Sequence, residues 1–450
     1  MTEHLTTAQR IVALMDHLGL ETAHVATQVP GDIAELVETA EARIAGVVLI
    51  VPTRLDAGPF AAVSERLLMI SGDKGLTVEM TGLAAERLPG AVRHVLANYE
   101  AAGWSDVVAD RADEITRVMA GFLEGVSHTA RLGTTGGQRP MAEAGEHAGL
   151  TWRLTGQGPP LLLLPFFLAP SQWEPAIAEL AQHFLVVQIG GPHIGGIAAL
   201  EDRARAPTYR AMFRTLVDLL APPPEARVLD VGCGSGALDR LLASMLGPSG
   251  RIVAADLNPF FLKEARALAE RHGLAERISF MEASATDLPF EDGSFDCAFS
   301  ITVLEECDAD RAIAELTRVV KPGGRVGIVV RAIDVPQWWN LELPQSLAAK
   351  VSVPPQSVAV GGVADRSLYE RMQRAGLTNL QAFPSLITLD RPDGPIWRYR
   401  EDAVLSQLTL SELDQWRKVT AEARAHDLLM QAHAMHAAVA KKPLVSSSRQ

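Results

Sequence analysis

The chain has 450 residues, of which 48% are hydrophobic and 21% charged, and its formal net charge at pH 7 is -13. This length predicts two or three domains, and the composition is that of a globular protein with ample material for buried cores. The negative charge opposes binding to a phosphate backbone or an anionic membrane surface, so we expect no nucleic acid and no membrane among the partners.

The cysteines and the N-terminus predict a cytoplasmic protein. Cys233, Cys297 and Cys307 fit no zinc motif and cannot all pair, which favours a reduced compartment and no metal site. Residues 1–10 are polar and lack the apolar core of a signal peptide. The strongest apolar run, 161–168, contains a proline and is too short to span a bilayer.

The first 125 residues alternate helical patterns with short apolar runs. Residues 45–52 and 66–72 are typical of buried strands, each closed by proline or glycine, and 91–97 is a further strand candidate. Residues 110–123 have the apolar spacing of a helix. The next stretch, 126–147, is rich in Gly, Thr and Ala and predicts a linker.

A second short piece, residues 148–200, has the pattern strand, helix, strand over 160–165, 173–183 and 184–189. From about residue 208 the chain alternates strands and helices, which predicts a mainly parallel sheet covered on both faces within a domain over 201–443. Its strand candidates are 227–231, 251–255, 278–282, 295–300 and 325–331. The tail, 444–450, is expected to be flexible.

The strongest local signal is the run Val228-Leu-Asp-Val-Gly-Cys-Gly-Ser-Gly236. A buried strand leads into three glycines and then into a helical pattern, so that backbone and ligand can approach closely. A tight strand-to-helix turn alone would explain these glycines. Asp256, at the end of the next strand, can accept bonds from both hydroxyls of a ribose. It is also compatible with an N-cap of the helix over 259–269.

Together these residues resemble the class I S-adenosylmethionine (SAM)-dependent methyltransferases, in particular the small-molecule branch that includes the ubiquinone/menaquinone type. The resemblance covers residues 208–443. It rests on five blocks: 228–236, Asp256, Asp287-Leu-Pro-Phe290, Gly293-Ser-Phe-Asp296 and Arg318-Val-Val-Lys-Pro-Gly-Gly324. It implies a Rossmann-like α/β fold, SAM as the cofactor, and methyl transfer to an O, N or C atom of a small-molecule acceptor.

The resemblance also implies the lining of the cofactor site. Asp230, Gly232, Gly234 and Gly236, with Cys233 in the same loop, border the methionine part, Asp256 the ribose and Leu257 the adenine. Ser284, followed by Ala285, stands where the family places an acid for the adenine amino group, and a hydroxyl binds that group more weakly. Asp287 is expected to be a cap or turn residue. Ser300 and Ile301 end a strand and are expected near the sulfonium.

The acceptor side is expected after the fifth strand, where active sites of open α/β sheets lie. Trp338 and Trp339 are candidates for the wall of an apolar pocket, with Asp334 at the start of the same loop. The alternative is that the two tryptophans are packing residues. His433 and His436 are more typical of ordinary helix or strand positions, and Cys307 has no local histidine that would make it a nucleophile.

The first 200 residues resemble the α/β-hydrolase family. Leu18-Gly-Leu-Glu-Thr-Ala-His-Val25 is similar to the approach to a nucleophile elbow, 67–73 to the strand that delivers the acid, and 104–111 to the C-terminal helix. Residues 156–165 and 184 onward are similar to that family's N-terminal strands, so the order is reversed. We therefore expect one circularly permuted domain, a hypothesis that separate units would refute.

The catalytic residues of that family are missing. The elbow pattern G-x-S-x-G aligns with Thr27-Gln-Val-Pro-Gly31, which places Val29 at the nucleophile position. The histidine is expected just before Trp104, where the chain reads Tyr-Glu-Ala-Ala-Gly, and Asp73 alone is not a catalytic group. A scaffold, a dimer surface or a lid are the roles left, and a homodimer is compatible with the sequence. A SAM-binding regulator or a hydrolase with another nucleophile are the alternative functions.

Overall fold

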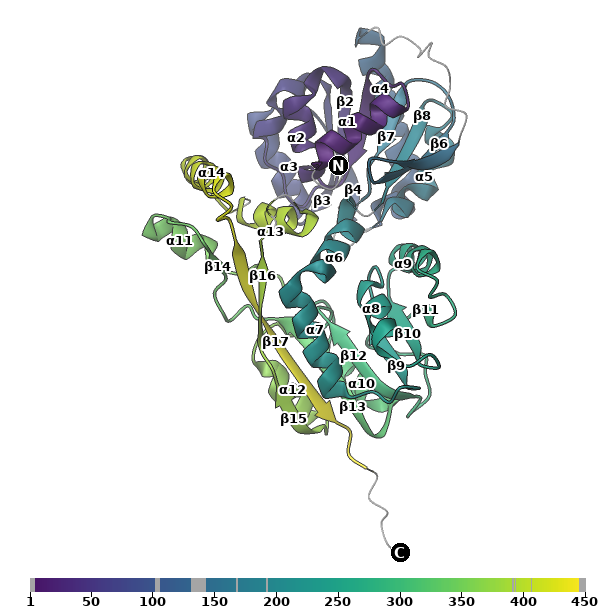
Figure 1. The fold of residues 1–450 in the computed structure, drawn as a ribbon. Coiled ribbons are helices and arrows are strands. Elements are labelled where there is room, and N and C mark those ends of the chain that lie inside the picture. The colour runs from purple at the N-terminus through teal and green to yellow at the C-terminus, as the bar shows by residue number, and fades with distance from the viewer. Residues whose placement is uncertain are drawn as a thin grey trace, which may run out of the picture. The chain divides into compact units, whose positions relative to one another are not determined.

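The chain forms two α/β units, each built around its own sheet (Figure 1). The computed structural model describes residues 5–101, 106–130, 143–166, 169–191, 193–390, 392, 394–405 and 407–444. The first unit comprises residues 1–199 with 393–407, and the second comprises 200–392 with 408–450. The second unit therefore differs from the domain expected over 201–443 in one stretch, because 393–407 pack with the first unit.

The first unit contains an eight-stranded sheet in the order β4-β3-β2-β1-β7-β8-β6-β5. Strand β6 runs antiparallel to both of its neighbours, and the other pairings are parallel. The strands are β1 (Ala23–Thr27), β2 (Ile44–Ile50), β3 (Leu67–Lys74), β4 (Val92–Glu100), β5 (Ala144–His147), β6 (Leu150–Thr155), β7 (Pro160–Leu163) and β8 (Leu185–Gly190). Because β1 pairs with β7, the stretches 1–125 and 148–200 share one sheet, as the permutation hypothesis requires.

Both faces of the central strands β1, β2 and β7 are buried, which explains their continuous apolar runs. On β2, Val47 and Leu49 face the core formed with α1 and α2, whereas Val48 and Ile50 face the core formed with α4 and α5. The helices are α1 (Thr7–His17), α2 (Gly31–Thr39), α3 (Leu76–Arg87), α4 (Val107–Ala130), α5 (Glu174–Leu180) and α13 (Pro395–Leu405). Short 3₁₀ helices are η1 (Glu41–Arg43), η2 (Gly58–Arg66) and η3 (Pro170–Trp173).

The stretch 126–147, expected to be a linker, contains regular structure at both ends. Helix α4 continues to Ala130, and residues 144–147 form the edge strand β5 against β6. Backbone hydrogen bonds hold an edge strand whatever its side chains, so composition alone does not reveal it. Residues 131–142 of this stretch, and 445–450 of the expected tail, lie outside the described residues.

The second unit contains a nine-stranded sheet with the order β11-β10-β9-β12-β13-β17-β14, and β15 and β16 also pair with β17. Its strands are β9 (Arg227–Val231), β10 (Arg251–Asp256), β11 (Ile278–Glu282), β12 (Phe295–Ile301), β13 (Val320–Arg331), β14 (Trp338–Trp339), β15 (Thr378–Ala382), β16 (Ser385–Leu389) and β17 (Gln431–Lys441). Strands β9 to β13 are parallel and β17 is antiparallel to β13. All five strands expected in this region are confirmed.

The helices of this unit, with α6 beginning in the first, are α6 (Gly195–Arg205), α7 (Pro207–Leu220), α8 (Ala237–Met245), α9 (Pro259–Arg271), α10 (Ala309–Val319), α11 (Gln345–Val351), α12 (Ser367–Arg374) and α14 (Leu410–Ala425). Leu229 and Val231 of β9 face the core that contains α10 and α12. Successive residues of a strand point to opposite faces, so Asp230 points to the other side.

The strand order reverses at β9. From β9 the chain proceeds through β10 to β11 on one side, and then returns to β12 and β13 on the other side. Open sheets of this kind bind ligands at the carboxyl ends of the strands beside such a switch point. We therefore expect a ligand-binding site at the loops that follow β9, β10 and β12 (Figure 1).

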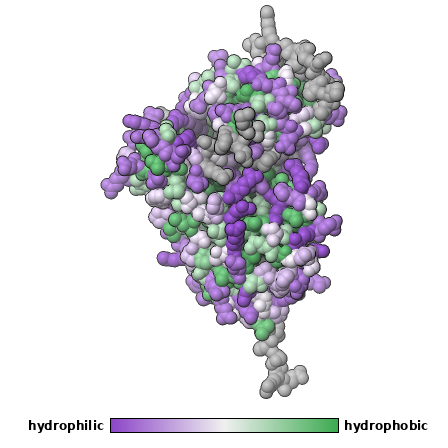
Figure 2. All heavy atoms as spheres, viewed as in Figure 1, coloured by the Kyte–Doolittle hydropathy of each residue, from purple (hydrophilic) through white to green (hydrophobic). Residues whose placement is uncertain are grey.

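On the face drawn in Figure 2, apolar residues occur in small groups among polar ones. In the part of the chain that the structure describes, no helix combines the length and apolar character needed to cross a membrane. Within the same residues, no group of three His, Cys, Asp or Glu side chains is placed to hold a metal ion.

Candidate functional site

The glycine loop between β9 and α8 is held in a conformation that side chains would prevent. Gly232, Gly234 and Gly236 have φ values of 84°, 53° and 69°. A Cβ on Gly232 would lie 2.0 Å from Val303 Cγ2, and a Cβ on Gly234 would lie 2.9 Å from Leu200 Cδ1. These glycines are therefore needed for close approach to neighbouring segments as well as for positive φ.

The amides of this loop bond to the end of β10. Gly232 and Cys233 N–H both donate to the Ala255 carbonyl oxygen, at 2.7 and 3.0 Å. Gly234 N–H donates to Asp256 Oδ2 at 2.9 Å. These three amides are therefore already bonded to the end of β10, which fixes the position of the loop.

Asp256 ends β10 and faces the loop. Its second oxygen, Oδ1, accepts from Asn258 N–H at 2.9 Å. Burial raises the pKa of Asp256, and the bonds from the Asn258 and Gly234 amides oppose that rise. The N-cap of α9 is Asn258, whose Oδ1 accepts from Phe260 and Phe261 N–H, so the alternative of Asp256 as the cap is wrong.

Asp230 is buried beside a second acid that the sequence did not single out. Asp239, in the first turn of α8, is 0% exposed and neither of its carboxyl oxygens has an N–H or O–H partner among the described residues. Burial and the neighbouring carboxylates raise the pKa of Asp230 well above its usual range. Burial also raises the pKa of Asp239 to about 7, against the opposing effect of Arg240. An acid in a first helical turn is common, so no sequence signal marked Asp239.

The adenine-side candidates lie at the ends of β10 and β11. The side chain of Leu257 is 67% exposed, and Ala285 is buried. Ser284 Oγ accepts from Thr286 N–H at 3.3 Å and lies 3.0 Å from Thr286 Oγ1. Asp287 N–H donates to the Ser284 carbonyl oxygen. Asp287 is therefore a turn residue, as predicted, and the Ser284 hydroxyl is part of the same turn.

At the end of β12, Ser300 joins the two strands that flank the switch point. Its Oγ donates to the Val231 carbonyl oxygen at 2.8 Å, and the side chain is fully buried. Ile301 is buried next to it. The following residue, Thr302, has φ 57°, which is strained for a β-branched residue and is often found near functional sites. Ser300 thus acts as a strand tie in this structure.

The two tryptophans expected on the acceptor side, after β13, differ in their surroundings. Trp339 is buried against Trp416 of α14, with ring centroids 4.9 Å apart at 86°, and its Nε1 donates to the Val351 carbonyl oxygen. Trp338 is 49% exposed. These contacts favour the packing alternative for Trp339.

Asp334 belongs to a chain of three polar side chains. Its Oδ1 lies 2.7 Å from His436 Nε2, and His436 Nδ1 lies 2.9 Å from Tyr369 OH. Although burial opposes it, the bond from His436 lowers the pKa of Asp334. His436 is a residue of β17, as expected of a strand position, but its pairing with Asp334 was not predicted, because the two are far apart in sequence.

Two further titratable groups lie in the loop after β12. Glu305 is buried, and its Oε1 accepts from Arg331 N–H at 2.7 Å. Burial raises the pKa of Glu305 to about 7 and that of Cys307 to about 11. A thiol with a raised pKa is a poor nucleophile at neutral pH, which agrees with the expectation for Cys307.

In the first unit, β1 leads through Gln28, Val29 and Pro30 into α2, the strand-turn-helix expected of an elbow. Val29 N–H donates to Thr27 Oγ1, and the turn carries no nucleophile at this position. Asp73 accepts from Asn98 and Tyr99 N–H at 2.7 and 3.0 Å. Asp73 therefore ties β3 to β4. The predicted histidine position adjoins 102–105, which lie outside the described residues.

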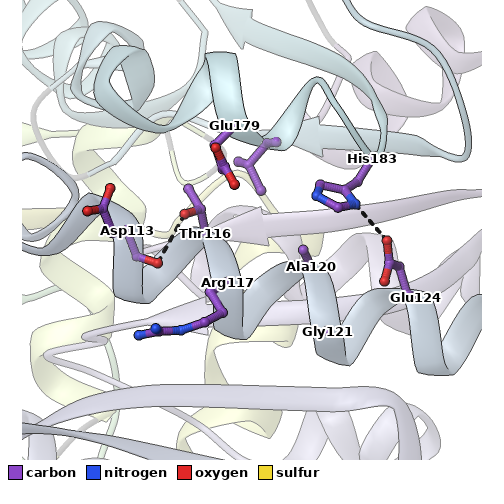
Figure 3. Close-up of a pocket in the computed structure, with 9 residues that line it drawn as sticks. Asp113, Thr116, Arg117, Ala120, Gly121, Glu124, Glu179 and His183 are labelled. Carbon is purple, nitrogen blue, oxygen red and sulfur yellow. Dashed lines mark hydrogen bonds and ion pairs between the residues drawn. The ribbon is translucent and has the colours of Figure 1, made fainter.

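A cavity of about 480 Å³ lies between α4 and α5 in the first unit (Figure 3). In Figure 3, Asp113 and Arg117 extend from α4, and His183 points to Glu124, with Nδ1 and Oε1 2.7 Å apart. The charged side chains that line it are exposed and of mixed sign, and among the described residues no unpartnered buried polar group lines the cavity. It is a surface groove remote in sequence from the glycine loop.

Comparison with known proteins identifies the second unit. Residues 228–324, which hold the glycine loop, Asp256 and β12, match the family model of a methyltransferase domain. Residues 228–324 thus form a methyltransferase domain, which supports the resemblance to the class I SAM-dependent methyltransferases of the small-molecule branch, whose cofactor is SAM.

The chain is similar to several ubiquinone/menaquinone biosynthesis C-methyltransferases named UbiE. That of Hahella chejuensis is 36% identical over 155 residues, which are 32% of this chain and 62% of that protein. That of Pseudomonas putida (strain KT2440) is 38% identical over 124 residues, 27% of this chain and 48% of that protein. The chain therefore spans less than two thirds of each of these relatives. A solved structure, the YcgJ protein from Bacillus subtilis, is 20% identical with a TM-score of 0.37, covering 52% of this chain and 99% of that one.

Proposed function

We propose that this protein transfers a methyl group from SAM to an oxygen, nitrogen or carbon atom of a small-molecule acceptor. The observation that carries the proposal is the bond from Gly234 N–H to Asp256 Oδ2, 2.9 Å long, at the switch point of the sheet. It places a glycine turn and a carboxylate from the adjoining strand in one site. The relatives are named C-methyltransferases, which adds support for a carbon acceptor without deciding between the three.

The residues present fit the cofactor. Each oxygen of Asp256 accepts one amide bond, and a carboxylate oxygen has a further lone pair with which to accept a ribose hydroxyl. The exposed side chain of Leu257 offers apolar surface for a purine ring. The buried carboxyl groups of Asp230 and Asp239 favour a ligand that carries positive charge, as the ammonium and sulfonium groups of SAM do.

When bound, SAM supplies an already activated methyl group. The chain's own task is then to hold the cofactor, to align the acceptor and to exclude water. Ser300 keeps β9 and β12 together at the point where both meet the site. His436 bonds to Asp334 through one ring nitrogen and to Tyr369 through the other, and we assign to these three residues the positioning of the loop after β13.

We further propose that the first unit is a circularly permuted α/β-hydrolase-like domain without hydrolase activity. The strand order supports this, because β5 to β8 form one half of the sheet and β1 to β4 the other, joined where β1 pairs with β7. Val29 at the elbow and the structural bonds of Asp73 argue against a catalytic triad. A homodimer and a cytoplasmic location stay predictions.

Calorimetry with SAM tests the methyltransferase proposal, followed by incubation with methyl-labelled SAM and a cellular extract of small molecules. Binding together with a labelled product, detected by mass spectrometry, is expected. Binding without a labelled product would favour a regulator. Absence of binding would overturn the proposal, and hydrolysis of a p-nitrophenyl ester in that case would favour the hydrolase alternative.

A further inference from the structure

Among the described residues, no lysine or arginine forms an ion pair with the acidic residues around the glycine loop. Asp230 comes from β9, Asp239 from α8 and Asp256 from β10; the first two are buried and Asp256 is half-buried. Asp256 receives two backbone N–H bonds, which stabilise its ionised form. Asp239 receives no such bond from any other described residue, and its carboxyl group interacts with that of Asp230.

Arg240, the cation that acts on Asp239, already has other partners. Arg240 Nη2 lies 2.6 Å from both carboxylate oxygens of Glu201 on α6, and its Nη1 donates to the Ser235 carbonyl oxygen at 2.8 Å. Glu201 also accepts from Ser235 Oγ at 2.6 Å. The Arg240–Glu201 pair is thus neutral as a unit. The Arg240 guanidinium lowers the pKa of Asp239 but does not outweigh the effect of burial, and the Cys233 thiol beside the two acids carries no charge.

Two buried carboxyl groups in contact cannot both ionise without a large electrostatic cost. One proton shared between them removes this repulsion and supplies the missing O–H donor. A bound cation removes the repulsion as well, by direct Coulomb attraction. Either a proton or a bound cation can therefore remove the repulsion between the two carboxylates.

We propose that the Asp230–Asp239 pair holds a proton in the cofactor-free protein and that the positive charge of SAM expels this proton to solvent on binding. This inference rests on the proposed function, because it takes SAM as the ligand of the glycine loop. It adds a residue, Asp239, to the cofactor site and makes cofactor affinity depend on pH. No bond other than that of the proton to a carboxyl oxygen breaks.

The expected pH dependence follows from linkage. Burial raises the pKa of both carboxyl groups, that of Asp239 to about 7, and the charge of Asp239 raises that of Asp230 further, so the pair is protonated below neutrality. Binding that releases a proton is weakened by added protons. The Kd for SAM should therefore fall by a factor approaching ~10 per pH unit as the pH rises towards about 7, and the dependence should weaken above it.

Calorimetry of SAM binding to the full chain at pH 6.5, in phosphate and in a buffer with a large ionisation enthalpy, counts the released protons. The ligand's amino group stays protonated at this pH and contributes little. We expect release approaching one proton for the wild type and none for Asp239→Asn, with Asp230→Asn as the second variant should the first fail to fold. Asp402→Asn is the matched control, since Asp402 also has a pKa of about 7 but lies in the first unit, and it should release as many protons as the wild type.

The two proposals fail in different ways. Binding with equal heats in both buffers would overturn this inference and leave the proposed function intact. Absence of SAM binding would overturn the proposed function itself. Loss of proton release in Asp402→Asn would place the proton elsewhere and also contradict the inference.

Discussion

Asp256 Oδ2 accepts the backbone N–H of Gly234 at 2.9 Å, so the tip of β10 and the turn after β9 form one rigid piece. The same carboxylate accepts Asn258 N–H through Oδ1, at the start of α9. One side chain therefore fixes the positions of two loops that border the proposed cofactor site. This arrangement explains why the residue types at 234 and 256 matter together.

Replacing Asp256 tests the ribose assignment. Asp256→Ala removes an acceptor for two backbone amides and for two ribose hydroxyls, and bonds to a charged group contribute ~1.5–3 kcal/mol each. We expect SAM to bind at least ~100-fold more weakly by calorimetry. Asp256→Asn, which keeps one acceptor oxygen, should lose less. Wild-type affinity in the alanine variant, with unchanged circular dichroism, would remove the assignment.

The close approach at Gly232 is tested by Gly232→Ala. The new Cβ would lie 2.0 Å from Val303 Cγ2 on a residue with φ 84°, so both a clash and backbone strain result. We expect a loss of ~2 kcal/mol or more in the free energy of unfolding, measured with urea. Gly273→Ala is the matched control, because Gly273 has φ 68° with nothing within 4 Å of its Cβ.

The same clash gives a second variant. Val303→Ala removes Cγ2, so the double variant Gly232→Ala/Val303→Ala should recover part of the lost stability while keeping the strain of positive φ. If Gly232→Ala costs no more than Gly273→Ala, the close contact with Val303 does not constrain the loop.

The ion pair between Arg240 and Glu201 is buried, with side-chain exposures of 9% and 10%. Removing one partner leaves an uncompensated charge, which costs ~3–5 kcal/mol in buried pairs. We expect Glu201→Gln and Arg240→Met each to destabilise the protein strongly, and the double variant to lose clearly less than the two losses combined, in urea unfolding. The exposed pair Arg374–Glu370 is the control, where a similar cycle should give under ~0.5 kcal/mol. Additive losses at 201 and 240 would contradict the pairing.

We expect the stability of the protein to depend on pH through Asp402, which lies in the stretch 393–407 of the first unit. Burial raises the pKa of Asp402 to about 7, against the attraction of Arg54 and Arg398, and Asp32 and Glu401 repel its charge. The native state therefore holds a proton that the unfolded state has lost between about pH 4 and 7, so stability is greatest on the acid side and falls as the pH rises through this range. Above pH 7 the effect is constant.

Asp402→Asn should remove this dependence. Three pKa units correspond to up to roughly 4 kcal/mol, so the wild type should lose more stability than the variant between pH 5 and pH 8. Urea unfolding at both pH values measures the difference. Equal losses in the two proteins would show that Asp402 ionises normally in the native state.

The sequence predicted the features of this protein that depend on neighbouring residues. A buried strand, a glycine turn and a helix follow one another directly at 228–245, and Asp256 ends the next strand, so local pattern located this turn and this acid. Continuous apolar runs likewise predicted β2, β3 and β7, because strands buried on both faces need apolar side chains in every position. The presence of Val29 at the position where the elbow pattern has its serine was likewise visible in the sequence.

Only the tertiary structure decided which distant groups meet. It placed Asp239 against Asp230, committed the Ser300 hydroxyl to Val231, buried Trp339 against Trp416 and brought 393–407 to the first unit. Such contacts depend on how helices and strands pack, and a side chain's type does not reveal its partner across the sheet. The charge balance of the proposed cofactor site therefore depends on the packing of three elements, which brings Asp239 to Asp230 and Asp256.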